Sequence, residues 1–232
     1  MKRGVSWATA LLLLVAGVAG CGRTVDGEAH VARGGGAATT DLIYSQSDLD
    51  RLLLSDAQIN AIMGTKTMTT WRTYTGMPEA AGEVYSSPQC AVALFNTTVP
   101  AYHASGFVTA RGRKIGEPSA DALYHDIDEA VVAFQSAGDA RGFVDAATKA
   151  WHDCSGRNVT YTDPGGQQDP WTIGVPRTVG PIIAIKNTST DEWGCGHAMT
   201  TRANLVVDVD ACGYTITDQA ITIVRAITTA SA

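Results

Sequence analysis

The chain has 232 residues, with 17 Lys or Arg against 23 Asp or Glu, and a formal net charge of -6 at pH 7. This acidic balance argues against nucleic acid as a partner. Hydrophobic residues make up 45% of the chain, which is enough to bury a folded core.

The N-terminus has the pattern of an export signal. Lys2 and Arg3 form a short basic segment, and residues 8–18 form an apolar stretch followed by small residues. The apolar stretch is shorter than the roughly 18 to 20 residues that a bilayer-spanning helix needs. We therefore predict a cleaved signal peptide over residues 1–20.

The segment Val18-Ala19-Gly20-Cys21 resembles the lipobox of bacterial lipoproteins. In that pattern, cleavage before Cys21 leaves the cysteine with a thioether-linked diacyl lipid, whose acyl chains, such as palmitate, hold the protein on a membrane. We expect a lipoprotein on the extracytoplasmic face of the cell membrane. The alternative is a free cysteine beside an ordinary secretory cleavage site.

Composition divides the mature chain into two parts. Residues 22–40 carry a Gly-Gly-Gly run, scattered charges and no apolar period, so they are predicted to form a flexible linker behind the lipidated Cys21. Residues 41–232 contain no second low-complexity segment and no internal repeat. Their length suits a single domain.

Four further cysteines, Cys90, Cys154, Cys195 and Cys212, form an even set in an exported chain, which predicts two disulfides. Sequence leaves three pairings open. We favour Cys90–Cys154 and Cys195–Cys212, the latter because a turn near Arg202 would bring two strand ends together. Zinc is the alternative, although the chain has no Cys-x-x-Cys pair.

Helix signals appear early in the domain. Ser55 is suited to cap a short helix that ends at Gly64. Ser87-Pro88 opens a second helix, because proline is tolerated at the first helical position, and Pro100 should kink or end it.

Two later helices also carry capping signals. Ser136 and Asp139 precede an apolar stripe that includes Trp151, which we assign to the core. Thr215 and Asp218 open a C-terminal helix whose β-branched content is unfavourable for helix formation.

Strand patterns fill the intervals between the helices. The predicted strands are 129–134, 181–185 and 204–211, with weaker candidates at 107–114 and 159–162 and a loop at 163–170. In the last strong strand, Leu205, Val207 and Val209 alternate with Val206, Asp208 and Asp210, so we predict one buried face. Strands without regular βαβ alternation favour an α+β fold, a central antiparallel sheet packed with helices.

Three segments carry a family resemblance: Trp151–Gly156, Cys195–Ala198 and Asn204–Cys212. With Cys90, they resemble the PknH-like extracellular sensor domain family over roughly residues 42–230. The resemblance implies an α+β fold, two intramolecular disulfides and a cleft for an unidentified extracellular ligand. The chain lacks the Gly-rich loop, catalytic Lys and His-Arg-Asp segment of kinases, so no kinase activity is implied.

Catalytic and metal-binding signals are weak. There is no Gly-x-Ser-x-Gly motif, and Ser105 beside His103 does not form a triad pattern. The acidic cluster of His125, Asp126, Asp128 and Glu129 is either a site for a hard cation or a solvated strand end; the second interpretation is favoured because no calcium-loop motif is present.

Two other polar groups have competing interpretations. Cys195 with His197 would suit copper or zinc, but a disulfide at Cys195 would forbid this. The basic cluster of Arg111, Arg113 and Lys114 would suit lipid headgroups or an anionic glycan, or is simply an exposed hairpin end. We predict no metal and no cofactor.

Four residues in segments that flank the strands, Trp71, Tyr102, His103 and Trp193, are predicted to line a binding cleft. The leading hypothesis is a noncatalytic module that binds a small-molecule or glycolipid ligand of the envelope, or another exported protein. One alternative is a hydrolase of envelope lipid or glycan, with an acid or base among Asp126, Asp128, Glu129 and His103. Another is a structural envelope component.

Overall fold

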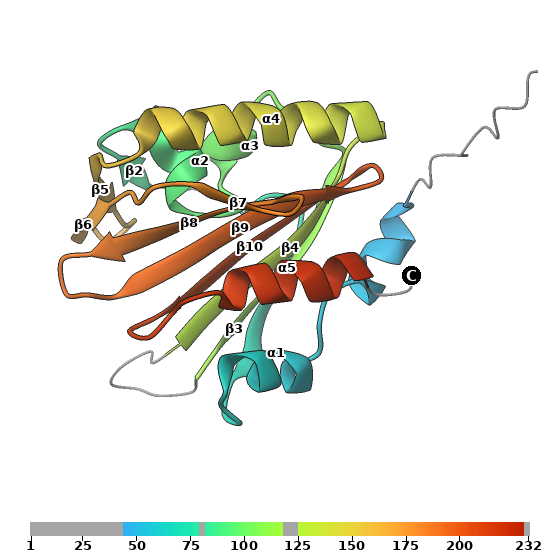
Figure 1. Cartoon of the computed structure of the whole chain (residues 1–232), viewed down its shortest axis with the longest axis horizontal. Helices are drawn as coiled ribbons and strands as arrows, with labels where there is room; N and C mark the ends of the chain where they lie inside the picture. Colours follow the sequence, from blue (N-terminus) through green and yellow to red (C-terminus); the bar gives the residue numbers. More distant parts are fainter. Residues whose placement is uncertain (1–43, 79–81, 118–124, 230–232) are drawn as a thin grey trace, which may run out of the picture. The chain divides into compact units, whose positions relative to one another are not determined.

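The computed structural model describes residues 44–78, 82–117 and 125–229. The predicted signal peptide, Cys21 and the linker lie outside these residues. Within them, ten strands form one antiparallel sheet in the order β1-β3-β4-β10-β9-β8-β6-β5-β2, with β7 paired to β8 (Figure 1). The strands are β1 (Thr69–Thr75), β2 (Val84–Tyr85), β3 (Thr109–Gly116), β4 (His125–Ala133), β5 (Asn158–Thr162), β6 (Gln168–Thr172), β7 (Arg177–Val179), β8 (Ile182–Ser189), β9 (Gly194–Arg202) and β10 (Leu205–Gly213).

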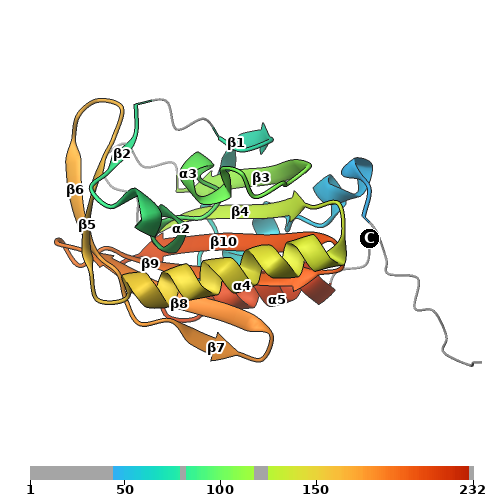
Figure 2. The ribbon, with the colours of Figure 1, turned by 90° about the horizontal axis from the view of Figure 1, so that it is seen from above.

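Helices cover both faces of the sheet. In Figure 1, α2, α3 and α4 lie on the upper face, while α1 and α5 lie on the lower face. Figure 2, seen from above, shows α4 in front of the strands and α5 behind them. Their bounds are α1 (Asp56–Met63), α2 (Ala91–Leu94), α3 (Val99–Tyr102), α4 (Ala137–Cys154) and α5 (Gln219–Thr229), with 3₁₀ helices η1 (Gln46–Arg51) and η2 (Pro88–Cys90). The predicted α+β fold with a central antiparallel sheet is confirmed. In the described part of the chain, no helix is both long and apolar enough to cross a bilayer.

The capping residues act as the sequence predicts. The Ser55 hydroxyl accepts the N–H of Gln58, and Gly64 ends α1 in the left-handed region at φ 72°. The Ser136 hydroxyl likewise accepts the N–H of Asp139 at 3.1 Å and begins α4. Trp151 of α4 is fully buried, as predicted.

Both disulfides join the favoured partners. Cys90–Cys154 links η2 to the C-terminal end of α4, and Cys195–Cys212 links directly opposed residues of β9 and β10. The hairpin between these strands turns after Arg202, with Ala203 at φ 53°. The hairpin argument for the second pair is therefore confirmed.

The central strand corrects one prediction. β10 lies between β4 and β9, and all nine of its residues are buried rather than those of one face alone. The apolar residues Leu205, Val207 and Val209 pack toward α1 and α5. Asp208 and Asp210 are also buried because helices and a loop cover the other face.

Three predicted boundaries also differ from the structure. The helix opened by Ser87-Pro88 ends at Leu94 rather than at Pro100, because Phe95 turns into extended backbone. Residues 168–170, the last part of the predicted loop 163–170, belong instead to β6. This strand tolerates Pro170 because its pairing to β8 covers only Trp171 and Thr172. The C-terminal helix begins at Gln219 rather than near Thr215.

Candidate ligand-binding cleft

A cleft of about 340 Å³ opens beside the upper face of the sheet. Its floor comes from β3, β4, β9 and β10, and its walls come from β1, the β2–β5–β6 strands and the loop after α2. The lining residues are Trp71, Arg72, Pro78, Glu83, Tyr85, Phe95, Asn96, Thr97, Thr98, Lys114, Asp126, Asp128, Tyr161, Trp171, Trp193, Cys195, Asp210 and Cys212.

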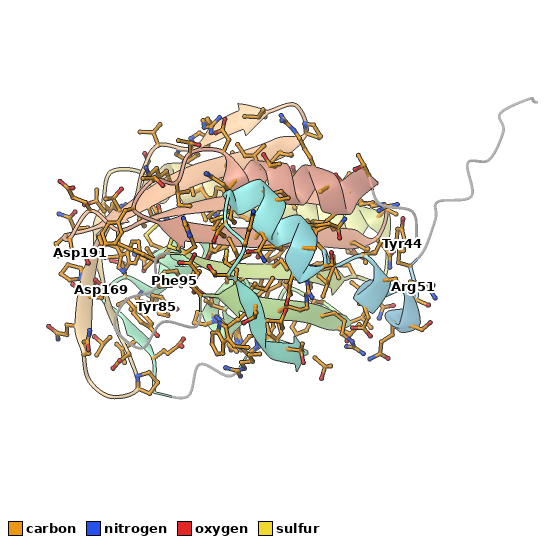
Figure 3. The ribbon with its side chains drawn as sticks, turned by 90° about the horizontal axis from the view of Figure 1, so that it is seen from below. Tyr44, Arg51, Tyr85, Phe95, Asp169 and Asp191 are labelled. Atoms are coloured by element: carbon orange, nitrogen blue, oxygen red, sulfur yellow. A yellow bond between two sulfur atoms is a disulfide. The ribbon has the colours of Figure 1, made fainter. Side chains whose placement is uncertain are left out.

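One wall of the cleft is an aromatic cluster centred on Phe95. The Phe95 ring meets Tyr161 and Trp171 edge to face, with centroids 5.3 and 5.4 Å apart, and Tyr85 at 6.4 Å. Figure 3 shows Tyr85 and Phe95 at the end of the domain away from Tyr44. These contacts fix the rings before any ligand arrives.

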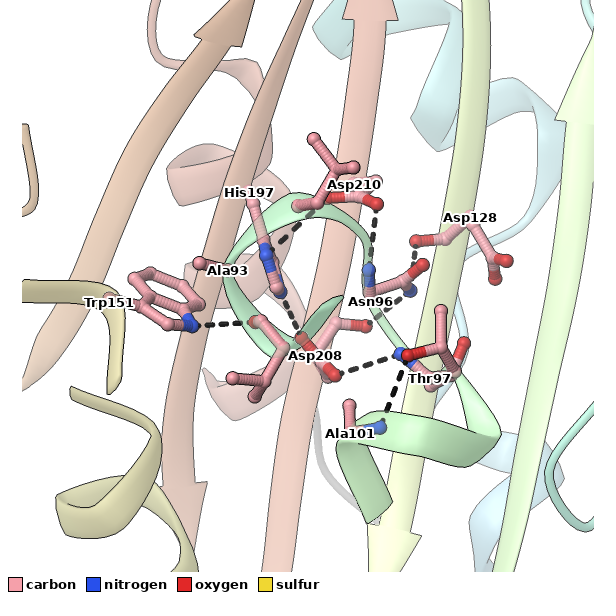
Figure 4. A network of polar contacts seen from close by, with 12 residues as sticks. Ala93, Asn96, Thr97, Ala101, Asp128, Trp151, His197, Asp208 and Asp210 are labelled. Carbon is pink, nitrogen blue, oxygen red and sulfur yellow. Dashed lines mark hydrogen bonds and ion pairs between the residues drawn. The ribbon is translucent and has the colours of Figure 1, made fainter. Parts of the chain in front are cut away.

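The loop after α2 is held by a buried aspartate of the central strand (Figure 4). The Asp208 carboxylate accepts the Thr97 N–H at 3.1 Å and the Tyr102 hydroxyl at 2.8 Å, and lies 2.7 Å from His197 Nε2. Burial alone would lower the pKa of His197, but the carboxylates of Asp210 and Asp208 outweigh burial and raise it.

Asn96 completes this attachment. Its backbone N–H donates to Asp210 at 2.8 Å, and its side-chain amide donates to the Asp128 and Asp208 carbonyls at 2.9 and 3.2 Å. The next residue, Thr97, has φ 43°, which is unusual for a β-branched side chain. The surrounding hydrogen bonds hold this strained conformation in the cleft wall.

Two carboxyl groups of the cleft floor have raised pKa values. Burial raises the pKa of Asp126 to about 6 and that of Asp210 to about 7, although Lys114 and His197 respectively act to lower them. Among the described residues, the Oδ1 atom of each is buried without a hydrogen-bond partner. The remaining floor aspartate, Asp128, is satisfied by Lys114 Nζ at 2.9 Å and by the Tyr74 hydroxyl at 2.6 Å.

The structure brings together two of the four residues predicted to bind a ligand. Trp71, 59% exposed, and Trp193 line the cleft. Tyr102 lies beneath the loop, 1% exposed, where it contacts Asp208 rather than the cleft. His103 is exposed and does not line the cleft.

The acidic cluster is not the solvated strand end that the sequence favoured. Asp126 and Asp128 line the cleft, whereas Glu129 is fully buried on the other face of β4. There, Glu129 pairs with Arg113 at 2.7 Å. Of the four residues considered as a catalytic acid or base, only Asp126 and Asp128 line the cleft, and Glu129 and His103 do not.

The basic cluster is likewise not an exposed hairpin end. Lys114 faces the cleft and Arg113 the opposite side, while Arg111 lies 3.4 Å from Asp50. All three side chains are at least partly buried in ion pairs because β3 is covered on both faces. Cys195 is bound in its disulfide, which excludes the metal site considered with His197.

Sequence reasoning missed most of the aromatic wall and the polar floor. Tyr85 and Trp171 lie on short strands that were not predicted, and Phe95 was placed inside a longer helix. Asp210 was placed on the solvated face of its strand, and His197 was considered only as a metal ligand with Cys195 or as an ordinary polar residue beside the disulfide. No local signal marks the buried aspartates, because an Asp-x-Asp pattern between apolar residues has the same period as a strand with one solvated face.

The fold and cleft together define a class: an α+β domain of the exported type, stapled by two disulfides and carrying a preformed concave site. Residues 45–229 match the family model described as the PknH-like extracellular domain, and the chain belongs to this family. Membership of this family of extracellular domains places the domain on the extracytoplasmic side of the membrane.

The family's relatives agree in sequence and in structure. The chain is 35% identical over 178 residues to serine/threonine-protein kinase PknH of Mycobacterium bovis and of Mycobacterium tuberculosis, covering 76% of this chain but only 29% and 28% of those kinases. It thus spans less than a third of their length. The crystal structure of the extracellular domain of PknH from M. tuberculosis superposes with a TM-score of 0.77 at 34% identity, covering 81% of this chain and 96% of that one.

Proposed function

We propose that this protein is a membrane-anchored extracytoplasmic lipoprotein whose sensor-like domain binds, without catalysis, a ligand of the envelope or an exported partner. The lipobox at Cys21 supports the anchor. The aromatic cleft supports the binding role, and family membership supports a sensor-type domain.

The observation that carries the binding role is the preformed state of the cleft. Its volume of about 340 Å³ falls in the range of small-molecule sites. Its walls are fixed by the Phe95 ring cluster, by the Asn96 contacts and by the Cys195–Cys212 disulfide in the floor. A rigid site of this kind loses little conformational entropy on binding.

The test is recovery of a ligand from cell-envelope extract on the purified protein, identified by mass spectrometry. Trp193→Ala removes a cleft aromatic, while Val108→Ala changes an exposed apolar residue that does not line the cleft. A molecule recovered unchanged by the wild type and by the Val108 variant, but not by the Trp193 variant, supports the proposal. Equal recovery by both variants contradicts it.

A hydrolase of envelope lipid or glycan is the second candidate, favoured by the raised pKa of Asp126 in the cleft. A carboxyl with a pKa of about 6 is suited to general acid catalysis. Turnover of an extract component that disappears in Asp126→Asn would establish it. A ligand that stays intact over long incubation excludes it.

A further inference from the structure

The cleft has more negative than positive groups. Among the described residues that line it, the carboxylates are Glu83, Asp126, Asp128 and Asp210, and the cations are Arg72 and Lys114. Lys114 is already committed to Asp128 at 2.9 Å, and Arg72 is exposed at the rim. Asp126 is therefore left without a cation in ion-pair contact, and Asp210 has only the distant contact to His197 Nδ1 at 3.9 Å.

These two carboxyls also have unused hydrogen-bonding capacity. Asp210 is only 4% exposed, and its Oδ1 has no hydrogen-bond partner; the nearest opposite group is His197 Nδ1 at 3.9 Å. Asp126 Oδ1 is likewise buried and unpartnered. A buried acceptor without a donor is costly, so these atoms mark a place where a donor from a ligand would be stabilising.

Aromatic rings surround this unpaired charge. Among the residues that the structure describes, six aromatic side chains line the cleft: Trp71, Tyr85, Phe95, Tyr161, Trp171 and Trp193. The electron-rich face of such a ring attracts an ammonium group within about 6 Å, with the largest gain when water is excluded.

We propose that the cleft selects a small organic cation, an ammonium group on an aliphatic body, which places its charge near Asp126 and Asp210 and its body against the aromatic wall. This inference rests on the proposed binding function and specifies its ligand class. An anion would meet unpaired carboxylates here. A neutral polyol could stack on the rings but would leave that charge uncompensated.

The test compares butylammonium and hexylammonium, whose N–H groups can donate to these carboxyls, with their uncharged isosteres, butanol and hexanol, by calorimetric titration of the full protein, with glucose as the polyol probe. Each cation should bind at least about tenfold more tightly than its isostere. Asp126→Asn should remove most of this difference. Asp145→Asn, the same change at an exposed position of α4, should keep it.

The pH dependence supplies a second readout. A cation needs ionised carboxyls, so its affinity should rise as pH increases from about 5 to about 8, through the raised pKa values of Asp126 and Asp210. The groups that face Asp126 are Lys114, Asp128 and Trp71. Those that face Asp210 are His197, Asp208, Asp128, Lys114 and the backbone of Asn96. The isosteres should show no such rise.

Three outcomes overturn the inference. In the first, the isosteres or glucose bind the wild type as tightly as the cations do, and this binding is lost in Trp193→Ala. This result would refute the cation selectivity but leave the proposed binding function intact. A neutral or anionic envelope ligand recovered while no cation binds would do the same. If neither probes nor extract yield a ligand, the proposed function fails together with the inference. Thermal unfolding of each variant verifies that it is folded.

Discussion

At the scale of single residues, Asp208 connects three parts of the chain that are distant in sequence. Its carboxylate joins His197 of β9, Tyr102 of α3 and the backbone of Thr97, and it is 1% exposed. Replacing this carboxylate by the amide of asparagine would leave the buried donors with one acceptor oxygen fewer, and the new NH₂ group would face them. We predict that Asp208→Asn lowers the free energy of unfolding by about 2 to 4 kcal/mol.

Urea denaturation of this variant measures the loss. Asp145→Asn is the matched control, because it makes the same chemical change on the exposed side of α4 and should stay within about 0.5 kcal/mol of the wild type. Equal stability of the two variants would show that the network around Asp208 does not hold the fold together.

Buried carboxyls also set a pH dependence of stability. Burial raises the pKa of Asp210 and Glu129 to about 7, from 3.8 and 4.5. The folded chain then retains protons that the unfolded chain releases between about pH 4 and pH 7, so the free energy of unfolding falls as pH rises through this window. The raised pKa of His197 acts in the same sense at higher pH.

We therefore predict a higher urea midpoint at about pH 5.5 than at about pH 8, and a smaller difference in Asp210→Asn. Exposed carboxyls with lowered pKa values, such as Asp48 and Asp153, act in the opposite sense only at lower pH. A midpoint that rises with pH in the wild type would refute this assignment of the buried protons.

The buried polar residues show where sequence reasoning stops. An Asp-x-Asp alternation against Leu205 and Val207 has the same period as a strand with one solvated face. Only the tertiary arrangement, with the Asn96 loop covering that face, turns Asp208 and Asp210 into internal acceptors. Trp71 and Trp193 were predicted to line the cleft because an aromatic residue in a segment beside a strand can be recognised in the sequence. The other cleft rings reach the cleft only through tertiary packing, which the sequence does not show.

At the scale of elements, the two disulfides provide a matched comparison. Each buries two cysteines, but the first closes a sequence separation of 64 residues and the second one of 17. If the bridges act mainly by restricting the unfolded chain, replacing both cysteines of a pair by alanine should cost about 4 kcal/mol for Cys90–Cys154 and about 3 kcal/mol for Cys195–Cys212.

Chemical denaturation of the two double-alanine variants under oxidising conditions measures both costs, with each remaining pair verified by non-reducing peptide mapping. A larger loss from the shorter loop would mean that native packing in the cleft floor outweighs chain entropy. The wild type under reducing conditions, which breaks both disulfides, should lose at least as much stability as the less stable of the two double-alanine variants.

Elements with local signals were predicted well, and those formed by tertiary contacts were not. Ser55 and Ser136 satisfy helix donors within three residues, so their caps can be recognised in the sequence. The end of α2 has no local signal: its last carbonyls accept the buried Asn187 amide, at 2.7 Å for Ala93 and 3.0 Å for Leu94. That donor lies more than 90 residues away.

At the scale of the whole molecule, the first described residue is fixed to the domain at the end away from the aromatic wall of the cleft. Tyr44 is tied into the domain by Asn204, whose Oδ1 accepts its N–H at 2.8 Å. Tyr44 and Arg51 lie at the end of the domain opposite Tyr85 and Phe95 (Figure 3).

The proposed lipid anchor would set where in the cell the whole protein is found. We predict that Cys21→Ala shifts the protein from the detergent phase to the aqueous phase after phase partition of cells, or stops it as an unprocessed precursor, because no other residue of the lipobox can form the thioether. The four domain cysteines are paired in the structure, which leaves Cys21 as the thiol available for lipid. Normal processing with full membrane retention in Cys21→Ala would refute the anchor, and an unchanged disulfide map would show that the variant's domain still folds.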